Sequence, residues 1–258
     1  MNYFFFLDSV KNYSSSVELF NKPSCSHLNK NVVNDKHIYA VYSNGEKWES
    51  FYFGTIKAND SILIKKQDLP DNFKNESVFI FMCEKIIKDF NQLPILKNEM
   101  ITSPEWRSNL KITNNFTSTS YQGEFPDMMI NKNLSVVSCS PMIQNYNNIS
   151  NYLFLINLRQ NPKIISFNVE LLNSNKKIIG EFQATTNTVN FFNLNQYTAN
   201  TNDNVFIVRT RDYGGIPIYF SHSCDERKLS LEHTHPPSSY LIFGDTMSFQ
   251  KKKKIFWS

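Results

Sequence analysis

Residue types that bind metal ions are concentrated near the C-terminal end of the chain, in the stretch Ser221–Pro237 (SHSCDERKLSLEHTHPP). This stretch holds three of the five histidines, His222, His233 and His235. Alternate residues of an extended strand point to the same face, so His233 and His235 share one face and Glu232 points to the other. With His222 on a neighbouring strand, this pattern predicts a site for Zn, Fe or Mn, with Glu232 as a fourth ligand or acid/base group.

A strand end is the alternative explanation of the same stretch. In that case the imidazoles cap carbonyl groups, and Pro236 and Pro237 begin a rigid turn. The three histidines predict, as an alternative function, a metal-dependent enzyme on a β-scaffold. The H-x-H pattern on a β-strand also resembles the metal motif of the cupin family. The family's motif also has a glycine before H-x-H and a glutamate shortly after it. Neither is found in this sequence, so the chain is not assigned to the family.

A second stretch, residues 103–129, concentrates aromatic and hydrogen-bonding side chains around a loop shaped by glycine and proline. Aromatic faces take the apolar CH surfaces of sugars or peptides, while amide, carboxylate and guanidinium groups pair with hydroxyl or backbone groups. We therefore predict a non-enzymatic binding or interaction protein that needs no cofactor. The favoured ligand is carbohydrate or a surface polysaccharide, and a protein is the second candidate ligand. The expected ligand-binding residues are Trp106, Arg107, Tyr121, Gln122 and Glu124. In the alternative explanation Trp106 is a core residue and YQGEFP is a turn.

Arg209 and Arg211 alternate with their neighbours in a predicted strand and would share one face. Two guanidinium groups on one face can hold a carboxylate or a phosphate through paired hydrogen bonds, so both are also candidate ligand-binding residues. A cross-strand ion pair with an acidic residue is the more common arrangement and is favoured.

The net charge of +4 comes from one short run, Lys251, Lys252, Lys253 and Lys254. Without these lysines the remaining positive charges equal the 23 negative ones. A nucleic-acid-binding protein needs basic charge spread over a face or groove, so nucleic acid is not an expected partner. The run permits contact with an anionic membrane surface, while a solvated edge or tail is the favoured explanation. The sequence leaves the oligomeric state open.

The cysteines and the N-terminus favour a reducing, cytoplasmic setting. The four cysteines lie far apart and form no C-x-x-C pair, which favours free thiols over a disulfide framework. The N-terminal MNYFFFLDSV lacks the basic region of a secretory signal. Only seven glycines are present and no P-loop or G-x-G-x-x-G pattern occurs, which argues against nucleotide-dependent catalysis.

The fold predicted from the sequence is all-β. Short segments rich in β-branched and aromatic residues are bounded by Asn, Gly, Ser or Pro at the spacing typical of sandwiches. Tyr42–Phe53 predicts a hairpin in which Asn44 and Gly45 supply positive φ angles, and Leu172–Phe182 predicts another. Apolar residues at helical spacing predict a short helix over Cys83–Leu93 that ends at a proline.

An approximate internal repeat accompanies these strands. The second hairpin follows the first by about half the chain length, and the segments 57–64 and 77–81 have counterparts at 185–192 and 204–208. We therefore predict two related antiparallel β-sandwich modules, Ig-like or jelly-roll-like, joined by the short helix. Residues 1–94 form the first and 95–258 the second. Such duplicated sandwiches also suit a structural assembly component of a virion or cell surface.

Overall fold

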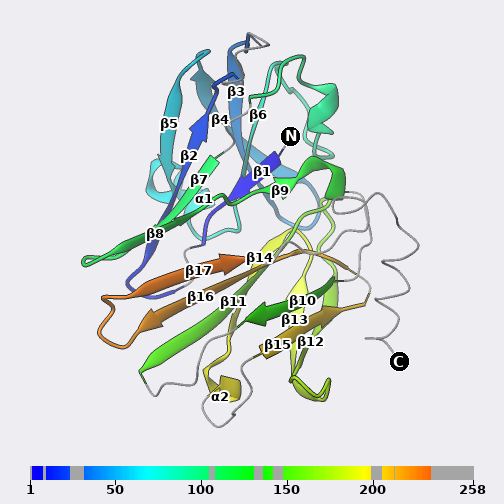
Figure 1. The fold of residues 1–258 in the computed structure, drawn as a ribbon. Coiled ribbons are helices and arrows are strands. Elements are labelled where there is room, and N and C mark those ends of the chain that lie inside the picture. The colour runs from blue at the N-terminus through cyan, green and yellow to red at the C-terminus, as the bar shows by residue number, and fades with distance from the viewer. Residues whose placement is uncertain are drawn as a thin grey trace. The chain divides into compact units, whose positions relative to one another are not determined.

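A computed structural model describes residues 2–7, 10–23, 32–104, 108–130, 136–141, 148–198, 205–211 and 213–233. It consists mostly of antiparallel β-sheets, which confirms the predicted all-β sandwich class (Figure 1). The chain divides into two compact units. Unit 1 contains residues 1–131, 158–164 and 187–189, and unit 2 contains residues 132–157, 165–186 and 190–258. Residues 94 and 95, between which the sequence predicts a module boundary, both lie within unit 1.

Unit 1 has a five-stranded and a four-stranded sheet. The order of the first is β4-β3-β6-β1-β9, formed by Trp48–Ile56, Lys36–Ser43, Phe79–Cys83, Asn2–Phe5 and Phe125–Pro126. The order of the second is β5-β2-β7-β8, formed by Ser61–Lys65, Ser14–Phe20, Ser108–Thr113 and Ser118–Tyr121. A short helix, α1 (Asp71–Lys74), connects β5 to β6. The 3-10 turns of unit 1 are Lys66–Asp68, Leu96–Asn98 and Asp127–Met129.

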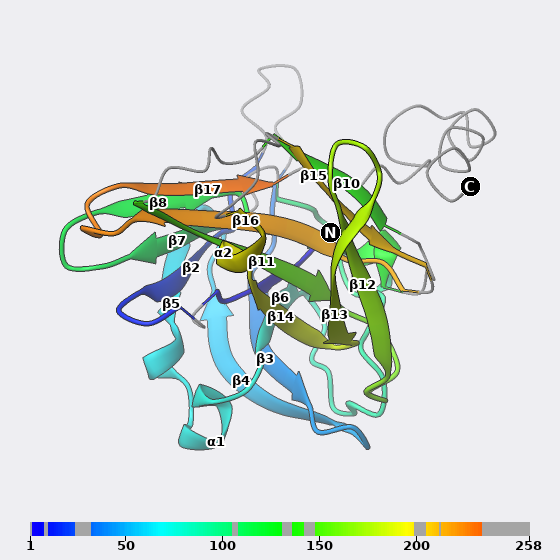
Figure 2. The same ribbon diagram turned by 90° about the horizontal axis from the view of Figure 1, so that it is seen from below.

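Unit 2 has two four-stranded sheets. The order of one is β10-β15-β12-β13, formed by Val136–Pro141, Val205–Thr210, Ser166–Leu172 and Ile178–Thr185. The order of the other is β14-β11-β16-β17, formed by Thr188–Asn193, Ile149–Asn157, Ile216–Ser223 and Leu229–His233. Figure 2 shows β16 and β17 side by side in orange. The helix α2 (Asn195–Thr198) connects β14 to β15.

The strand orders of the two units correspond. When β10 to β17 are matched in sequence order with β1 to β8, both sheets of unit 2 repeat the neighbours found in unit 1, and β9 is an addition to unit 1. The short helices α1 and α2 also occupy the same place in this order. The main difference is the connection that follows β6, residues 84–107, because the equivalent connection after β15 is only residues 211–215.

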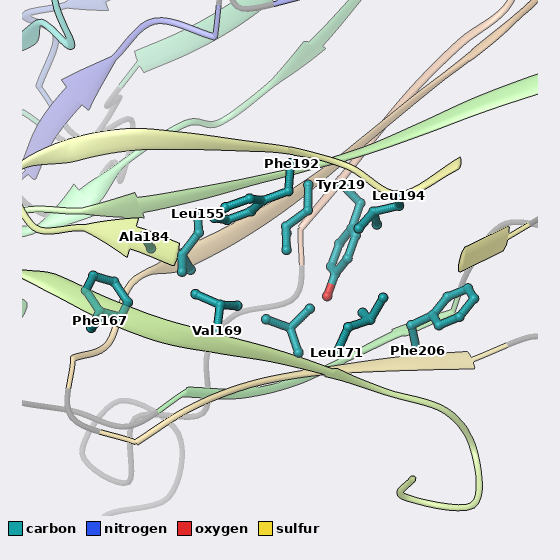
Figure 3. Close-up of a cluster of buried hydrophobic side chains, with 11 residues drawn as sticks. Leu155, Phe167, Val169, Leu171, Ala184, Phe192, Leu194, Phe206 and Tyr219 are labelled. Carbon is teal, nitrogen blue, oxygen red and sulfur yellow. The ribbon is translucent and has the colours of Figure 1, made fainter. Parts of the chain in front are cut away.

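Apolar side chains between the sheets of unit 2 form its core (Figure 3). Phe167, Val169 and Leu171 alternate along β12 and share one face. In the close-up they face Leu155 and Phe192, which come from β11 and β14. Leu155 and Val169 are fully buried, so this alternation of apolar residues fixes which face of β12 points inward.

Three hairpin turns begin with an asparagine whose side chain accepts hydrogen bonds from the turn. Asn44 Oδ1 accepts from the backbone N–H groups of Glu46 and Lys47, both at 3.0 Å. Asn114 and Asn173 do the same in the β7–β8 and β12–β13 turns. The predicted β3–β4 hairpin is therefore confirmed, but the expected role of Asn44 is wrong. Gly45 has a φ of 93°, whereas Asn44 lies outside the left-handed region and acts through its side chain.

The helix predicted over Cys83–Leu93 does not form. Cys83 ends β6, and the following residues are irregular. Asp89 accepts a hydrogen bond from the backbone N–H of Asn91 at 2.9 Å, a local turn that competes with helical pairing. Ile86 is 65% exposed, although a helix with the predicted apolar face would bury it. The apolar residues belong instead to an irregular segment, in which Phe90 packs on Tyr39 and Phe81 of the sheet and Leu93 is fully buried.

Two segments from later in the sequence complete unit 1. Trp48 Nε1 donates a hydrogen bond to the carbonyl of Gln160 at 2.9 Å, and Ser43 Oγ donates to the carbonyl of Pro162. The backbone N–H of Val189 donates to Ser77 Oγ at 3.2 Å. Unit 1 is therefore not a continuous stretch of sequence, because its buried polar groups find partners more than 100 residues away.

Candidate ligand-binding site

A polar and aromatic cluster lies on one face of the β3–β4 pair in unit 1. Tyr39 is directly opposite Tyr52, and His37 is directly opposite Thr55, so all four side chains share that face. Tyr52 is 49% exposed, Thr55 is exposed and His37 is half-buried, while Tyr39 is buried beside them. We call these four residues the Tyr52 surface.

A bulge at Gly54 brings Tyr52 and Thr55 to the same face. Side chains three residues apart in a regular strand point to opposite faces. Here Ile38 pairs with Gly54 and Tyr39 pairs with Tyr52, so Phe53 is the extra residue of the bulge. Gly54 has a φ of 142°, which side chains with a Cβ rarely adopt. The glycine thus permits the shift that builds the cluster.

Replacing Gly54 by alanine should separate backbone strain from crowding. No atom lies within 4 Å of the position that a Cβ would take, so the cost comes from the φ angle alone. We expect a loss of about 1–2 kcal/mol in unfolding free energy, measured by urea denaturation. Gly45→Ala strains the hairpin turn in a similar way and is the matched control. Only Gly54→Ala should also disturb the alignment of Tyr52 with Thr55. An unchanged stability of Gly54→Ala would contradict this account of the bulge.

Three polar atoms of the Tyr52 surface form a triangle. Tyr52 Oη is 2.8 Å from Thr55 Oγ1 and 3.1 Å from His37 Nδ1. Thr55 Oγ1 is 3.3 Å from the same ring nitrogen. The Tyr52 ring also lies 5.4 Å from the Tyr39 ring and 5.8 Å from the His37 ring, measured between centroids. These contacts hold the phenol in a fixed position while one part of it faces solvent.

The connection after β6 contacts the cluster through Tyr39. The Tyr39 ring stacks on Phe81 with centroids 5.4 Å apart and also contacts Phe90, which lies in that connection. Tyr39 Oη accepts a hydrogen bond from the backbone N–H of Ile87 at 3.1 Å. Burial raises the pKa of Tyr39, so its hydroxyl stays protonated near neutral pH. Tyr39 is therefore a supporting residue, and Tyr52 is the exposed one.

A buried ion pair fastens the same connection to β3. Lys36, whose side chain is fully buried, lies with Nζ 3.2 Å from Glu84 Oε1 and donates to Thr102 Oγ1 at 3.0 Å. Glu84 accepts further hydrogen bonds from the backbone N–H groups of Thr102 and Ile101, at 2.8 and 3.1 Å, and from Asn34 Nδ2 at 3.1 Å. The carboxylate thus joins the two ends of the connection.

Burial and hydrogen bonding oppose each other at Glu84. Burial alone would raise the pKa of this carboxyl, but the hydrogen bonds from Thr102, Asn34 and Ile101 outweigh it and lower the pKa to about 2. Burial lowers the pKa of the Lys36 ammonium, although the hydrogen bond and charge of Glu84 act in the other direction. The ionised pair is thus matched by hydrogen bonds, as a buried pair requires.

The charges next to the Tyr52 surface belong to Asp35 and Lys57. Lys57 Nζ lies 2.7 Å from Asp35 Oδ2, and the backbone N–H of Ala58 donates to the other carboxylate oxygen at 2.9 Å. The hydrogen bond from Lys57, followed by that from Ala58, lowers the pKa of Asp35. Both side chains are exposed, so the pair places one charge of each sign near the cluster.

The end of β8 and the loop that follows it hold three of the residues predicted to bind a ligand. Tyr121 pairs with Leu110 at the edge of its sheet and is partly exposed, and Gln122 is exposed. Glu124 is buried and its carboxylate accepts a hydrogen bond from the side chain of Asn2. Trp106 and Arg107 lie outside the described residues. Of the three residues that the structure describes, two are at least partly exposed and Glu124 is buried. The ligand-binding role of all five residues stays a prediction.

Arg209 and Arg211 lie next to Glu170 on the neighbouring strand. Arg209 is directly opposite Glu170 and its Nε donates to that carboxylate, while Arg211 Nη2 lies 3.6 Å from the other oxygen. Arg209 is 8% exposed and Arg211 is 56% exposed. The cross-strand ion pair favoured by the sequence is thus present, and Glu170 is its acid.

The predicted metal ligands are only partly described. His222 of β16 is opposite Leu229, and His233 is opposite Ile218, which lies four residues before His222 in β16. His222 stacks on Tyr152 with ring centroids 5.7 Å apart, and its Nδ1 donates to the carbonyl of Ser223 at 2.9 Å.

The other predicted metal ligands are Glu232, His233 and His235. Glu232 is exposed, whereas the His233 side chain and all of His235 lie outside the described residues. Within the described ranges, no three His, Cys, Asp or Glu side chains gather in a group able to hold a metal ion. The lysine run 251–254 also lies outside the described residues.

The thiols of Cys83 and Cys224 are free, the first buried and the second exposed. Burial, helped by the charges of Glu99 and Glu84, raises the pKa of Cys83 to about 12, so this thiol stays protonated. Its Sγ donates to the carbonyl of Lys85 at 3.0 Å. No helix in the described part of the chain is both long and apolar enough to cross a membrane.

Comparison of the chain with protein-family models, with curated proteins and with solved structures gives no match.

Proposed function

We propose that the protein is a non-enzymatic binding protein and that unit 1 binds carbohydrate at the Tyr52 surface. The observation that carries the proposal is a half-exposed Tyr52 ring whose hydroxyl is fixed by Thr55 and His37. A rigid aromatic face suits the apolar CH face of a sugar ring, and hydroxyl and imidazole groups beside it suit the sugar hydroxyls. Because the ring is already held in place, little conformational entropy is lost on binding.

The neighbouring groups favour binding over catalysis. Asp35 is the carboxylate next to the cluster, and it is paired with Lys57 and with the backbone of Ala58. A general base has to be within hydrogen-bond reach of the proton that it removes and tuned toward the working pH. The pKa of Asp35 is instead lowered by these partners, which makes it a weak base.

Duplication of one β-sandwich module is the proposal that accounts best for the two units. It is supported by the identical neighbour relations in their sheets. The sequence repeats also fall on equivalent elements. The two repeated hairpins are β3–β4 and β12–β13, and the later repeated segments overlap β5 and β14, and then β6 and β15. The Tyr52 surface and the long connection belong to unit 1, so we assign binding to unit 1.

Replacing Tyr52 by alanine is the direct test of carbohydrate binding. The probes are immobilised dextran, dextran sulfate, amylose, mannan and cellulose. We expect the wild-type protein to be retained on at least one of them, and Tyr52→Ala to weaken that retention about tenfold or more, since central aromatic contacts dominate binding energies.

Phe116→Ala is the matched control, because Phe116 is another exposed aromatic residue of unit 1, 64% exposed in the β7–β8 turn. Its retention should equal that of the wild type. Equal losses in the two variants, or no retention of the wild-type protein on any of the five polysaccharides, would refute the proposed function.

A further inference from the structure

The triangle at the Tyr52 surface contains more hydrogen-bond distances than hydroxyl hydrogens. Three distances join Tyr52 Oη, Thr55 Oγ1 and His37 Nδ1, and each is within hydrogen-bond range. The two hydroxyl groups supply one hydrogen each, and the ring nitrogen supplies one or none. The protonation state of His37 therefore decides how many hydrogens remain to face a ligand.

With a neutral ring whose proton is on Nε2, the triangle uses both hydroxyl hydrogens internally. One hydroxyl donates to Nδ1, and the second donates to the oxygen of the first, which the 2.8 Å distance between Tyr52 and Thr55 allows. The atoms that face solvent are then oxygen lone pairs. A ligand satisfies this surface by donating hydrogen bonds, as the hydroxyl groups of a neutral sugar do.

With a protonated ring, Nδ1 becomes a donor and no longer accepts. It donates to one of the two hydroxyl oxygens, one hydroxyl hydrogen is used between the oxygens, and the other hydrogen turns outward. The surface now offers a donor and a positive charge. A ligand satisfies this form by accepting hydrogen bonds and carrying negative charge, as a sulfate or carboxylate group on a sugar does.

The groups around His37 that could affect its protonation state lie on β4, on β6 and in the neighbouring ion pair. On β4 the ring faces Tyr52 and Thr55, and on β6 the residue opposite His37 is Cys83, whose thiol stays protonated. The charged neighbours are Asp35 and Lys57, which form an ion pair with each other, and Asp35 also interacts with the charge of His37. Histidine is the side chain that changes charge between about pH 5 and pH 8.

We propose that His37 determines the class of ligand at the Tyr52 surface, so that the neutral imidazole selects uncharged sugars and the protonated imidazole selects anionic ones. This inference rests on the proposed carbohydrate binding and adds a specificity that depends on pH. His37 acts through the two hydroxyl groups and through its own charge.

Dextran and dextran sulfate are suitable probes, because they share a backbone and differ in negative charge. The measured quantity is the ratio of retention on the two polymers at pH 8 and at pH 5, at constant ionic strength. We expect the wild-type ratio to move about tenfold or more toward dextran sulfate at the lower pH. His37→Gln keeps an acceptor without a titration, so its ratio should stay near the wild-type value at pH 8. His37→Lys keeps a positive donor, so its ratio should stay near the wild-type value at pH 5.

Charges elsewhere on the protein are the same in the wild type and in His37→Gln. A pH-dependent change that persists in His37→Gln would therefore overturn the inference while leaving carbohydrate binding in place. Absence of retention on either polymer at both pH values would count against the preference, and the Tyr52→Ala test on the full panel decides the proposed function separately.

The arrangement of hydrogens can also be measured without a ligand. The ¹⁵N chemical shifts of the His37 ring show which nitrogen carries the proton. In the neutral ring we expect the proton on Nε2 and an unprotonated Nδ1, and in the charged ring we expect a proton on each nitrogen. A neutral ring that carries its proton on Nδ1 would overturn the inference, because one hydroxyl hydrogen would then face outward at both pH values.

Discussion

Replacing Glu84 by glutamine is expected to destabilise unit 1 by about 3 kcal/mol, because it leaves the buried ammonium of Lys36 without its counter-charge. The same substitution weakens the hydrogen bonds that Thr102 and Ile101 donate to the carboxylate. Hydrogen exchange of backbone amides in unit 1 and unit 2 is the suitable measurement, since it reports on each unit separately. Protection should fall in unit 1 and stay unchanged in unit 2.

Asp71→Asn is the matched control for Glu84→Gln. Asp71 pairs with Lys74 at 2.7 Å, but its side chain is 97% exposed, and exposed pairs contribute little to stability.

The wild-type protein should also lose stability in acid through Glu84. Its folded pKa of about 2 lies below the usual glutamate value, so the contribution is complete above about pH 5 and is lost as the pH falls toward 2. Equal stability of Glu84→Gln and Asp71→Asn, or the same acid profile in Glu84→Gln and the wild type, would contradict this role of Glu84.

Gly215→Ala is expected to destabilise unit 2 by about 2–3 kcal/mol. A Cβ at this position would lie 2.5 Å from the carbonyl oxygen of Ile156, which is a backbone atom of the paired strand β11. Backbone atoms in a ladder cannot move without disturbing the neighbouring hydrogen bonds, so the added methyl group forces β16 away from β11. Urea denaturation combined with amide exchange of β11 and β16 measures the effect.

Gly180→Ala is the comparison for Gly215→Ala. The added Cβ at Gly180 would lie 2.6 Å from the ring of Tyr197, which is a partly exposed side chain and can move. This variant should lose less stability than Gly215→Ala and keep normal exchange in β11 and β16. A larger loss in Gly180→Ala would show that the close approach at Gly215 is not the limiting contact.

The sequence predicts the β-structure well, because alternation and turn residues are local signals. Both repeated hairpins form as β3–β4 and β12–β13. The prediction of a helix over Cys83–Leu93 is wrong. Apolar spacing indicates which residues are buried, but it does not determine the backbone conformation in which they are buried. Phe90 packs on Tyr39 and Phe81 from an irregular segment, which satisfies the same pattern without a helix.

The candidate site was harder to predict than the fold. His37, Tyr52 and Thr55 belong to strands that the sequence identifies in part, but the shared face depends on a bulge at Gly54. A strand without the bulge would place Tyr52 and Thr55 on opposite faces, so alternation alone argues against the cluster. A glycine within a strand pattern is the available signal, since it often marks a bulge.

The ion pairs illustrate a second limit of the sequence. Arg209 and Arg211 were expected on one face with an acidic partner, but Glu170 is 39 residues away from Arg209 and is chosen by strand register. Lys36 and Glu84 are likewise joined by the pairing of β3 with β6. Partners of this kind follow from sheet order, which a single sequence does not encode locally.

Unit 1 is built from segments that are far apart in the sequence, and this affects when its contacts can form during translation. When residue 131 leaves the ribosome, every strand of the five-stranded sheet exists, but Trp48 and Ser43 still lack the carbonyl groups of Gln160 and Pro162. The segment containing Val189 follows only after several more seconds of elongation at ordinary rates. Unit 1 therefore lacks these hydrogen bonds until most of the second half of the chain has been synthesised.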